Sequence, residues 1–308
     1  MTLTPEMKAG VLAEALPYIR RFRGKVVVVK YGGAVFAAAG AGQAGASAGD
    51  DLDGSPAADP ESAARTSFAE DIVLMRAVGM LPVVVHGGGP QIGALMARLG
   101  KVPEFRDGLR VTDAETLEIA RMVLVGKVNR EIVGAINVHG PIAVGLSGED
   151  AGLITAGPLD PLLGYVGDVV AVDPSIIHKL VAEGLVPVIA TIGADAAGQA
   201  YNINADTVAG AVAEALEAEK LVFLTDVEGV RRDVGDPASL LQTISAEELD
   251  ELADEGAVGS GMIPKARACA SAVRHGVASA HVLDGRLVHV LLLEIFTPEG
   301  VGTMVTLP

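Results

Sequence analysis

The chain has 308 residues, half of them hydrophobic, which is enough for one large α/β domain or two lobes with a sizeable core. Its formal charge of -16 argues against a nucleic-acid-binding surface and against docking on anionic membranes, but not against a local positive pocket for an anionic substrate. The single cysteine, Cys269, excludes an intramolecular disulfide and a cysteine-based zinc site. Without a recognisable signal peptide or membrane-spanning run, we expect a cytoplasmic protein.

The first predicted element is a helix over residues 5–23, with an apolar stripe and three arginines near its end. Because it precedes the first strand, it could pack either on a partner subunit or on its own domain. We therefore treat residues 1–24 as an N-terminal helix that could serve as an oligomerisation arm.

Strand-like runs then alternate with helical spacing along the rest of the chain. The strands are predicted at residues 25–30, 82–86, 142–148, 185–192, 221–224, 280–283 and 302–307, with a β-hairpin arm at 164–173. This alternation predicts an α/β fold, a three-layer αβα sandwich around a mostly parallel central sheet of roughly eight strands.

Two connections carry local signals. Residues 37–64 are rich in Ala, Gly, Ser, Asp and Pro and have almost no large apolar residue, so we expect a disordered insertion there. Thr112 and Glu115 have the spacing of a capping box, which predicts that a helix starts after Thr112.

The sequence at residues 82–90, PVVVHGGGP, predicts a buried strand, a glycine turn and then a helix. Three glycines allow a ligand to approach the backbone closely, and the amides at a helix N-terminus favour an anion. The alternative is a tight turn without a ligand. We interpret His86, just before the glycines, as a hydrogen-bonded turn residue rather than a base.

Two basic residues are candidate anion ligands. Lys30 lies at the C-terminal end of a predicted strand, where open α/β sheets bind ligands, although its ammonium group could also simply reach solvent. Arg110 could bind a carboxylate with its planar fork, but a loop arginine is more often a surface charge.

The glycine turns match neither a Walker A loop nor a dinucleotide-binding fingerprint, so a nicotinamide oxidoreductase is poorly supported. Lys30, Lys265, Asp206 and the glycine amides instead suit phosphoryl transfer. In that chemistry, positioning and charge neutralisation supply most of the rate.

Six motifs occur in the order seen in the amino-acid kinase family, which the chain resembles over nearly its whole length outside residues 37–64. They are KYGG at 30–33, HGGGP at 86–90, GLRVT at 108–112, NINAD at 202–206, TDVEG at 225–229 and GMIPK at 261–265. Within that family the chain looks most like the branch that phosphorylates N-acetyl-L-glutamate in arginine biosynthesis. The resemblance leaves aspartate, glutamate or carbamate kinases, and a non-catalytic arginine-binding sensor, as alternatives.

The resemblance implies a role for each matching residue. Lys30 and Lys265 would neutralise the transferring phosphoryl group, and Asp206 would hold both lysines. The implied phosphate-binding residues are Gly32, Gly33 and Gly88; the implied substrate-binding residues are Gly88, Gly89, Arg110, Asn202 and Asn204; and the implied nucleotide-binding residues are Thr225, Asp226, Val227, Gly229, Val230 and Lys265.

The resemblance also implies two lobes and a cofactor. Residues 25–218 would bind the acceptor and residues 219–308 would bind ATP. The Mg²⁺ would be held by the ATP phosphates, with no metal site built from the protein. No general base is needed, because the acceptor carboxylate is already ionised at neutral pH.

The C-terminal sequence, HVLLLEIFT at 289–297 followed by GVGTM at 300–304, resembles the arginine-inhibited members of the family. Those members carry an extra N-terminal helix that pairs dimers into a hexamer, so the resemblance implies L-arginine as inhibitor and a homo-oligomer that is a trimer of dimers. The expected arginine site contains Tyr18, Lys220, His289, Glu294 and Gly300. A signalling protein of the PII type binds some relatives, and nothing in the sequence indicates whether one binds here.

Overall fold

The computed structural model describes residues 4–32, 60–256, 258–259, 261–297 and 300–308. Its main feature is an eight-stranded sheet in the order β12-β14-β13-β11-β1-β2-β8-β5. Neighbouring strands are parallel except for the β13–β14 pair. The bounds are β1 (Val26–Tyr31), β2 (Leu81–His86), β5 (Ala143–Ser147), β8 (Val186–Ala190), β11 (Lys220–Thr225), β12 (Thr243–Ser245), β13 (Ser279–Asp284) and β14 (Thr303–Thr306).

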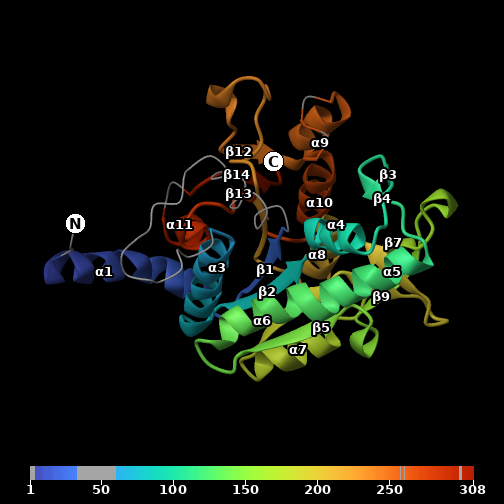
Figure 1. The fold of residues 1–308 in the computed structure, drawn as a ribbon. Helices are drawn as coiled ribbons and strands as arrows, with labels where there is room; N and C mark the ends of the chain where they lie inside the picture. Colours follow the sequence, from blue (N-terminus) through green and yellow to red (C-terminus); the bar gives the residue numbers. More distant parts are fainter. Residues whose placement is uncertain (1–3, 33–59, 257, 260, 298–299) are drawn as a thin grey trace, which may run out of the picture.

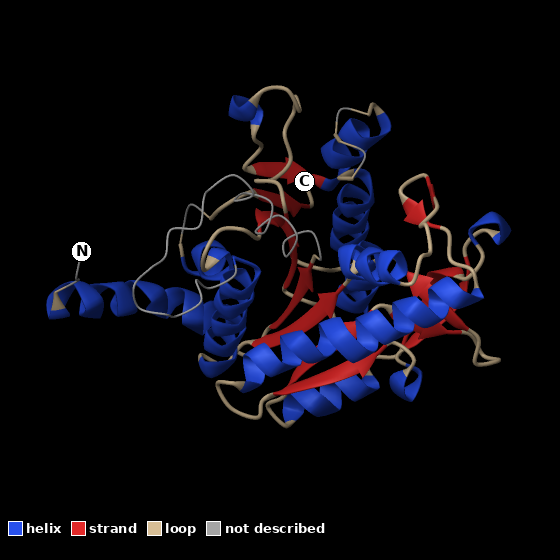
Figure 2. Cartoon of the chain, in the orientation of Figure 1, coloured by secondary structure: helices blue, strands red, loops and turns tan. Residues whose placement is uncertain are grey.

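Helices cover both faces of this sheet, which confirms the expected αβα sandwich (Figures 1 and 2). Successive residues of a strand point to opposite faces. Accordingly, Val28 packs in one core cluster, with α7 (Ser175–Ala182), α8 (Ala205–Ala215), α9 (Ala246–Asp254) and α10 (Ile263–Arg274). Val27 and Val29 pack in the other cluster, with α3 (Pro60–Ala77), α4 (Gly89–Arg98), α5 (Ala114–Arg121), α6 (Asn129–Asn137) and α11 (Val290–Phe296).

A closed four-stranded barrel, β10-β7-β6-β9, lies beside the large sheet. Its strands are β6 (Ile154–Pro158), β7 (Val166–Val172), β9 (Ile192–Ala194) and β10 (Ala200–Ile203). The sequence predicted the β7 arm of this unit but not the short strands that close it. A separate two-stranded ribbon is formed by β3 (Phe105–Arg106) and β4 (Leu109–Arg110).

Two local expectations need correction. Helix α3 begins at Pro60, so residues 60–64 belong to a helix and not to the expected insertion over 37–64, whose remaining residues lie outside the described part of the chain. The N-cap of α5 is Asp113, whose carboxylate accepts from the Thr116 amide at 2.8 Å. Thr112 instead forms a buried bridge with Gly164, so the predicted capping box is wrong.

Helix α1 (Pro5–Phe22) extends away from the body of the molecule, at the left of Figure 1. Its last turn is anchored, because Phe22 is buried in the core and α1 contacts α11. The apolar stripe nearer the N-terminus is exposed: Val11 is 57% exposed and Leu12 is 72% exposed. The described residues therefore leave this stripe largely uncovered.

One long helical stretch, from α5 to α6, packs against the glycine turn at residues 87–89. Helices α5 and α6 are joined without a break by a π-helical segment, Met122–Val128. Such wide turns are rare and often mark functional sites. A Cβ atom on Gly88 would lie 2.7 Å from Leu124 Cδ2, so the glycine turn packs directly on this segment.

His86, the last residue of β2, is completely buried at this junction. Its Nδ1 lies 3.0 Å from the Gly87 carbonyl oxygen, and its Nε2 lies 3.1 Å from Nδ2 of Asn129. Burial lowers the pKa of His86 to about 4, and the nearby charge of Arg130 acts in the same direction. The imidazole is therefore neutral at pH 7, which agrees with its interpretation as a turn residue.

The buried neutral His86 predicts a loss of stability in mild acid. Its pKa is lower in the folded chain than in the unfolded one, so its contribution is complete above pH 6.5 and is lost as the pH falls toward 4. The loss amounts to about 3 kcal/mol of unfolding free energy. The unfolding free energy of the native chain and of His86→Asn can be measured by urea unfolding between pH 7 and 4. We expect it to fall more steeply with decreasing pH in the native chain than in the variant. Equal slopes would contradict this prediction.

Candidate active site

The carboxylate of Asp206 joins two lysines from distant parts of the sequence. Lys30 Nζ lies 2.8 Å from Asp206 Oδ1, and Lys265 Nζ lies 3.1 Å from Asp206 Oδ2. The Lys30 and Asp206 side chains are buried, while Lys265 is 19% exposed. The sequence reasoning named all three residues, and the structure brings them into direct contact.

Local structure explains why these three side chains meet. Lys30 lies near the C-terminal end of β1, Asp206 lies in the first turn of α8, and Lys265 lies in the first turn of α10. Asn204 is the N-cap of α8, and its side-chain oxygen accepts from the Asp206 amide at 2.7 Å. A helix N-terminus favours a carboxylate, so the start of α8 is a suitable place for Asp206.

The lysines also keep Asp206 ionised. Burial alone would raise the pKa of this carboxyl, but the charges and hydrogen bonds of Lys30 and Lys265 outweigh it and hold the pKa below its usual value. One carboxylate therefore faces two ammonium groups, and the cluster as a whole carries an excess of positive charge. Such a cluster can neutralise an anion that binds beside it.

Lys30 opens onto a cavity of about 230 Å³ that is lined by the glycine turn. Five of the predicted substrate-binding residues line it: Gly88, Gly89, Arg110, Asn202 and Asn204. Gly32 is buried beyond the end of β1 and does not line this cavity, and Gly33 lies outside the described residues.

Arg110 is held at the rim of this cavity by three contacts. Its Nη2 donates to the Gly89 carbonyl at 2.8 Å, its Nη1 lies 3.4 Å from Met96 Sδ, and its guanidinium stacks 4.7 Å from the Phe105 ring centre. Partial burial lowers its pKa from the usual value, but arginine remains charged at neutral pH. The Arg110 guanidinium is thus held in one orientation before a carboxylate binds.

Lys265 opens onto a second cavity, of about 500 Å³. All the predicted nucleotide-binding residues line it: Thr225, Asp226, Val227, Gly229, Val230 and Lys265. Thr225 ends β11, and its hydroxyl accepts from the Val227 amide at 3.1 Å, which folds the chain back at the strand end. Asp206 thus lies between two lysines that line different cavities.

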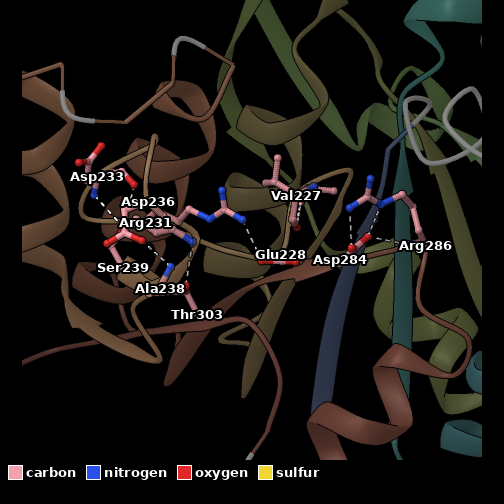
Figure 3. A network of polar contacts seen from close by, with 12 residues as sticks. Val227, Glu228, Arg231, Asp233, Asp236, Ala238, Ser239, Asp284, Arg286 and Thr303 are labelled. Carbon is pink, nitrogen blue, oxygen red and sulfur yellow. Dashed lines mark hydrogen bonds and ion pairs between the residues drawn. The ribbon is translucent and has the colours of Figure 1, made fainter.

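The larger cavity also contains Arg286, which the sequence reasoning missed. Its guanidinium binds Asp284 at both carboxylate oxygens, at 2.8 and 2.7 Å (Figure 3). Asp284 ends β13 directly opposite Thr225 of β11, so the cation is presented at the rim of the cavity. The sequence signal for it was an Asp-Gly-Arg run directly after a buried strand.

A loop after β11 lines the same cavity, and polar contacts within this loop are drawn in Figure 3. Arg231 Nη2 donates to Glu228 Oε2 at 3.0 Å, and the Ser239 hydroxyl accepts from the Asp233 amide at 3.1 Å. At Gly229, where φ is +156°, a Cβ atom would lie 2.6 Å from Thr303 Oγ1, so no larger residue fits there without movement.

A third cavity, of about 730 Å³, lies between the end of α1 and the C-terminal strands. Four of the five residues expected for an arginine site line it: Tyr18, Lys220, Glu294 and Gly300. His289 does not. Its Nδ1 lies 2.6 Å from Asp71 Oδ1, and its amide donates to the Ser67 hydroxyl, so it ties α11 to α3 instead.

A different histidine, His281, contacts two of the residues expected for the arginine site, Lys220 and Glu294, although it does not line the cavity itself. It is completely buried, with Nδ1 2.8 Å from Glu294 Oε1 and Nε2 2.8 Å from Lys220 Nζ. Burial lowers the pKa of His281. Burial would raise the pKa of Glu294, but His281, the Val301 amide and Lys220 together hold it below its usual value. The cavity therefore has an ionised carboxylate in its wall.

A metal site built from the protein is not found in the part of the chain that the structure describes. There, no three His, Cys, Asp or Glu side chains converge as ligands. The Asp206 carboxylate is already engaged by two lysines. The described helices also include none that is both long and apolar enough to cross a membrane.

Known acetylglutamate kinases are similar to this chain over most of its length. The curated acetylglutamate kinase of Symbiobacterium thermophilum is 54% identical over 97% of this chain and 97% of its own length. The chloroplastic acetylglutamate kinase of Arabidopsis thaliana is 47% identical over 98% of this chain and 81% of its own length.

The fold also matches the N-acetylglutamate synthase of Neisseria gonorrhoeae. Its complex with coenzyme A and N-acetyl-glutamate superposes with a TM-score of 0.79 at 27% identity, over 97% of this chain and 63% of the synthase chain. Its complex with coenzyme A and L-arginine gives 0.77 at 26% identity, over 97% of this chain and 65% of the synthase chain. This chain thus spans somewhat under two thirds of the synthase. Residues 25–284 match the amino acid kinase family, and the chain belongs to that family.

Proposed function

We propose that this chain is an acetylglutamate kinase, which transfers the γ-phosphoryl group of ATP to the γ-carboxylate of N-acetyl-L-glutamate. The observation that carries the proposal is the pair of lysines held by Asp206, one lining each of two cavities. The names of the relatives at 47–54% identity support the choice of substrate.

The reaction needs two anions to approach each other. An oxygen of the acceptor carboxylate forms a bond to the γ-phosphorus in line with the bond to the β,γ-bridging oxygen, which breaks, and ADP leaves with that electron pair. No proton is removed, because the carboxylate is already ionised. The protein's task is to offset the repulsion between the anions and to align them.

Each residue of the site has a role in this scheme. Lys30 neutralises the transferring group from the acceptor side, Lys265 does so from the side of the leaving ADP, and Asp206 fixes the distance between them. Gly88 and Gly89 offer backbone amides to phosphate and acceptor oxygens. Arg110 binds the α-carboxylate of the acceptor with Asn202 beside it, and Asn204 holds the first turn of α8.

The cavity of about 500 Å³ that Lys265 lines suits the nucleotide. Thr225, Asp226, Val227, Gly229 and Val230 form its wall around the adenine and ribose, and Arg286 adds a positive charge at its rim. Mg²⁺ held by the ATP phosphates would neutralise part of their charge. In this scheme residues 25–218 serve the acceptor and residues 219–308 the nucleotide.

We also propose that L-arginine inhibits the enzyme by binding in the third cavity. Glu294 suits a guanidinium, and Tyr18, Lys220 and Gly300 line the same space. The complex of the synthase relative with coenzyme A and L-arginine supports this ligand. The exposed stripe of α1 supports a homo-oligomer built through that helix, a hexamer in our proposal, and a single cysteine suits a cytoplasmic location.

The acceptor is tested by ADP release with N-acetylglutamate, aspartate, glutamate and carbamate in parallel assays. We expect release with N-acetylglutamate far above that with the other three. Preference for another acceptor would assign the chain to a different kinase of the family. No release with any acceptor, together with L-arginine binding, would favour a non-catalytic sensor.

Substitution of Lys30 tests the catalytic cluster. Lys30→Met retains most of the apolar stem but removes the charge, so we expect kcat to fall by a factor on the order of 10²–10³, as for loss of one preorganised electrostatic group. Lys25→Met is the matched control, because Lys25 precedes the same strand and pairs with Glu219 at 3.2 Å. If both variants turned over at the native rate, Lys30 would have no role in catalysis.

Glu294→Gln tests the arginine site. We expect millimolar L-arginine to inhibit the native chain and the half-inhibiting concentration to rise about tenfold or more in the variant, because a charged hydrogen bond is lost. Activity without arginine should not change, since Glu294 lines neither of the two cavities that Lys30 and Lys265 line. An enzyme insensitive to arginine would contradict the regulatory part of the proposal.

A further inference from the structure

Two buried polar side chains stand behind the glycine turn without lining either cavity. His86 ends β2, and Asn129 begins α6 directly after the π-helical segment. Neither side chain is accessible to solvent. Since burying polar groups is costly unless their hydrogen bonds are made, their arrangement needs an explanation.

The hydrogen bonds of Asn129 allow one orientation of its amide. Nδ2 lies 2.8 Å from the Val188 carbonyl oxygen and 3.4 Å from that of Leu146, and both are acceptors only. Oδ1 accepts from the Arg130 guanidinium. The two hydrogens of the NH₂ group are shared among these two carbonyls and Nε2 of His86. Because an amide nitrogen cannot accept a hydrogen bond, Nε2 of His86 faces it as an acceptor and carries no proton.

This arrangement places the single imidazole proton on Nδ1, where it donates to the Gly87 carbonyl oxygen at 3.0 Å. A trans peptide is planar, and its C=O and N–H point in opposite directions. Holding the Gly87 carbonyl on His86 consequently directs the Gly88 amide the other way. Gly88 lines the cavity that Lys30 also lines.

The surroundings of Asn129 hold it in place. A Cβ atom on Gly145 of β5 would overlap both the Asn129 amide and the Arg130 guanidinium, so the absence of a side chain at Gly145 makes room for them. Leu124 and Val128, on the turn just before Asn129, contact the position where a Gly88 side chain would be. One helical segment thus supports both the glycine turn and the amide that fixes His86.

We propose that Asn129 is a positioning residue for phosphoryl transfer: through His86 it sets the plane of the Gly87–Gly88 peptide and so aims the Gly88 amide at the reacting phosphate. This inference rests on the proposed kinase function. It assigns Asn129 no contact with substrate. Its effect should therefore appear in turnover and not in nucleotide binding.

The kinetic test compares Asn129→Leu with Asn137→Leu. Asn137 lies on the same helix and bonds backbone groups of residues 142 and 143, far from the glycine turn in the hydrogen-bond network. Both variants lose side-chain hydrogen bonds, which are buried at Asn129 and partly buried at Asn137, and both should unfold at lower temperature. We expect only Asn129→Leu to lower kcat by about tenfold or more, with KM for ATP within about threefold of native.

A second pair of variants tests the route through His86. Asn places its amide nitrogen near the position of histidine Nδ1, so His86→Asn retains a donor to the Gly87 carbonyl, whereas His86→Leu does not. We expect His86→Asn to retain at least about ten times the kcat of His86→Leu. Equal activities would overturn the proposal, as would equal losses of kcat in Asn129→Leu and Asn137→Leu.

A measurement on the native chain covers variants that fail to fold. Nitrogen-15 NMR of histidine-labelled native protein, with the ring signals assigned through the backbone resonances, should find the His86 proton on Nδ1. A proton on Nε2 would overturn the proposal. A native chain that shows no kinase activity would instead refute the proposed function, so the two failures are distinguishable.

Discussion

The candidate active site depends on one buried carboxylate between two ammonium groups. A carboxylate as enclosed as Asp206 would be strongly destabilising without partners, because its hydration is lost. Lys30, Lys265 and the first turn of α8 replace that hydration. In return, the carboxylate fixes two flexible side chains from β1 and α10. The C-terminal end of β1 and the first turns of α8 and α10 come together at this point, which brings the three side chains into contact.

Much of the fold could be predicted, because its strands are governed by local patterns. Runs such as Val26–Val29 are apolar on both faces, as expected for strands covered by helices on each side. The small barrel was missed because β9 and β10 are only three and four residues long. They pair with each other locally, but the barrel closes only through their pairings with β6 and β7, which are farther away in the sequence. The start of α5 was misplaced by one residue because Thr112 and Asp113 are both good N-caps, and only the buried bridge of Thr112 to Gly164 decides between them.

The site was predictable to a similar degree, and for a different reason. Motif order named Lys30, Asp206 and Lys265, and the structure joins them. The sequence also named His289 for the third cavity, which His289 does not line, and it did not name His281. His289 starts α11 with a φ of +56° and turns toward α3, while His281 lies within β13 and faces Glu294. Arg286 was missed for the same reason, because the direction of a side chain after a strand depends on tertiary contacts and not on spacing.

Strand β11 has a different cavity at each end. Lys220, its first residue, lines the space beside α1, and Thr225, its last residue, lines the space beside Lys265. All six residues are buried, and β1 and β13 pair with the strand along its length. Six residues of strand span about 17 Å. Because the strand is closely packed on every side, its residues have little room to move independently of one another. Any change of affinity that an occupant of one cavity caused in the other through this strand would, by thermodynamic reciprocity, be matched by the same factor in the opposite direction.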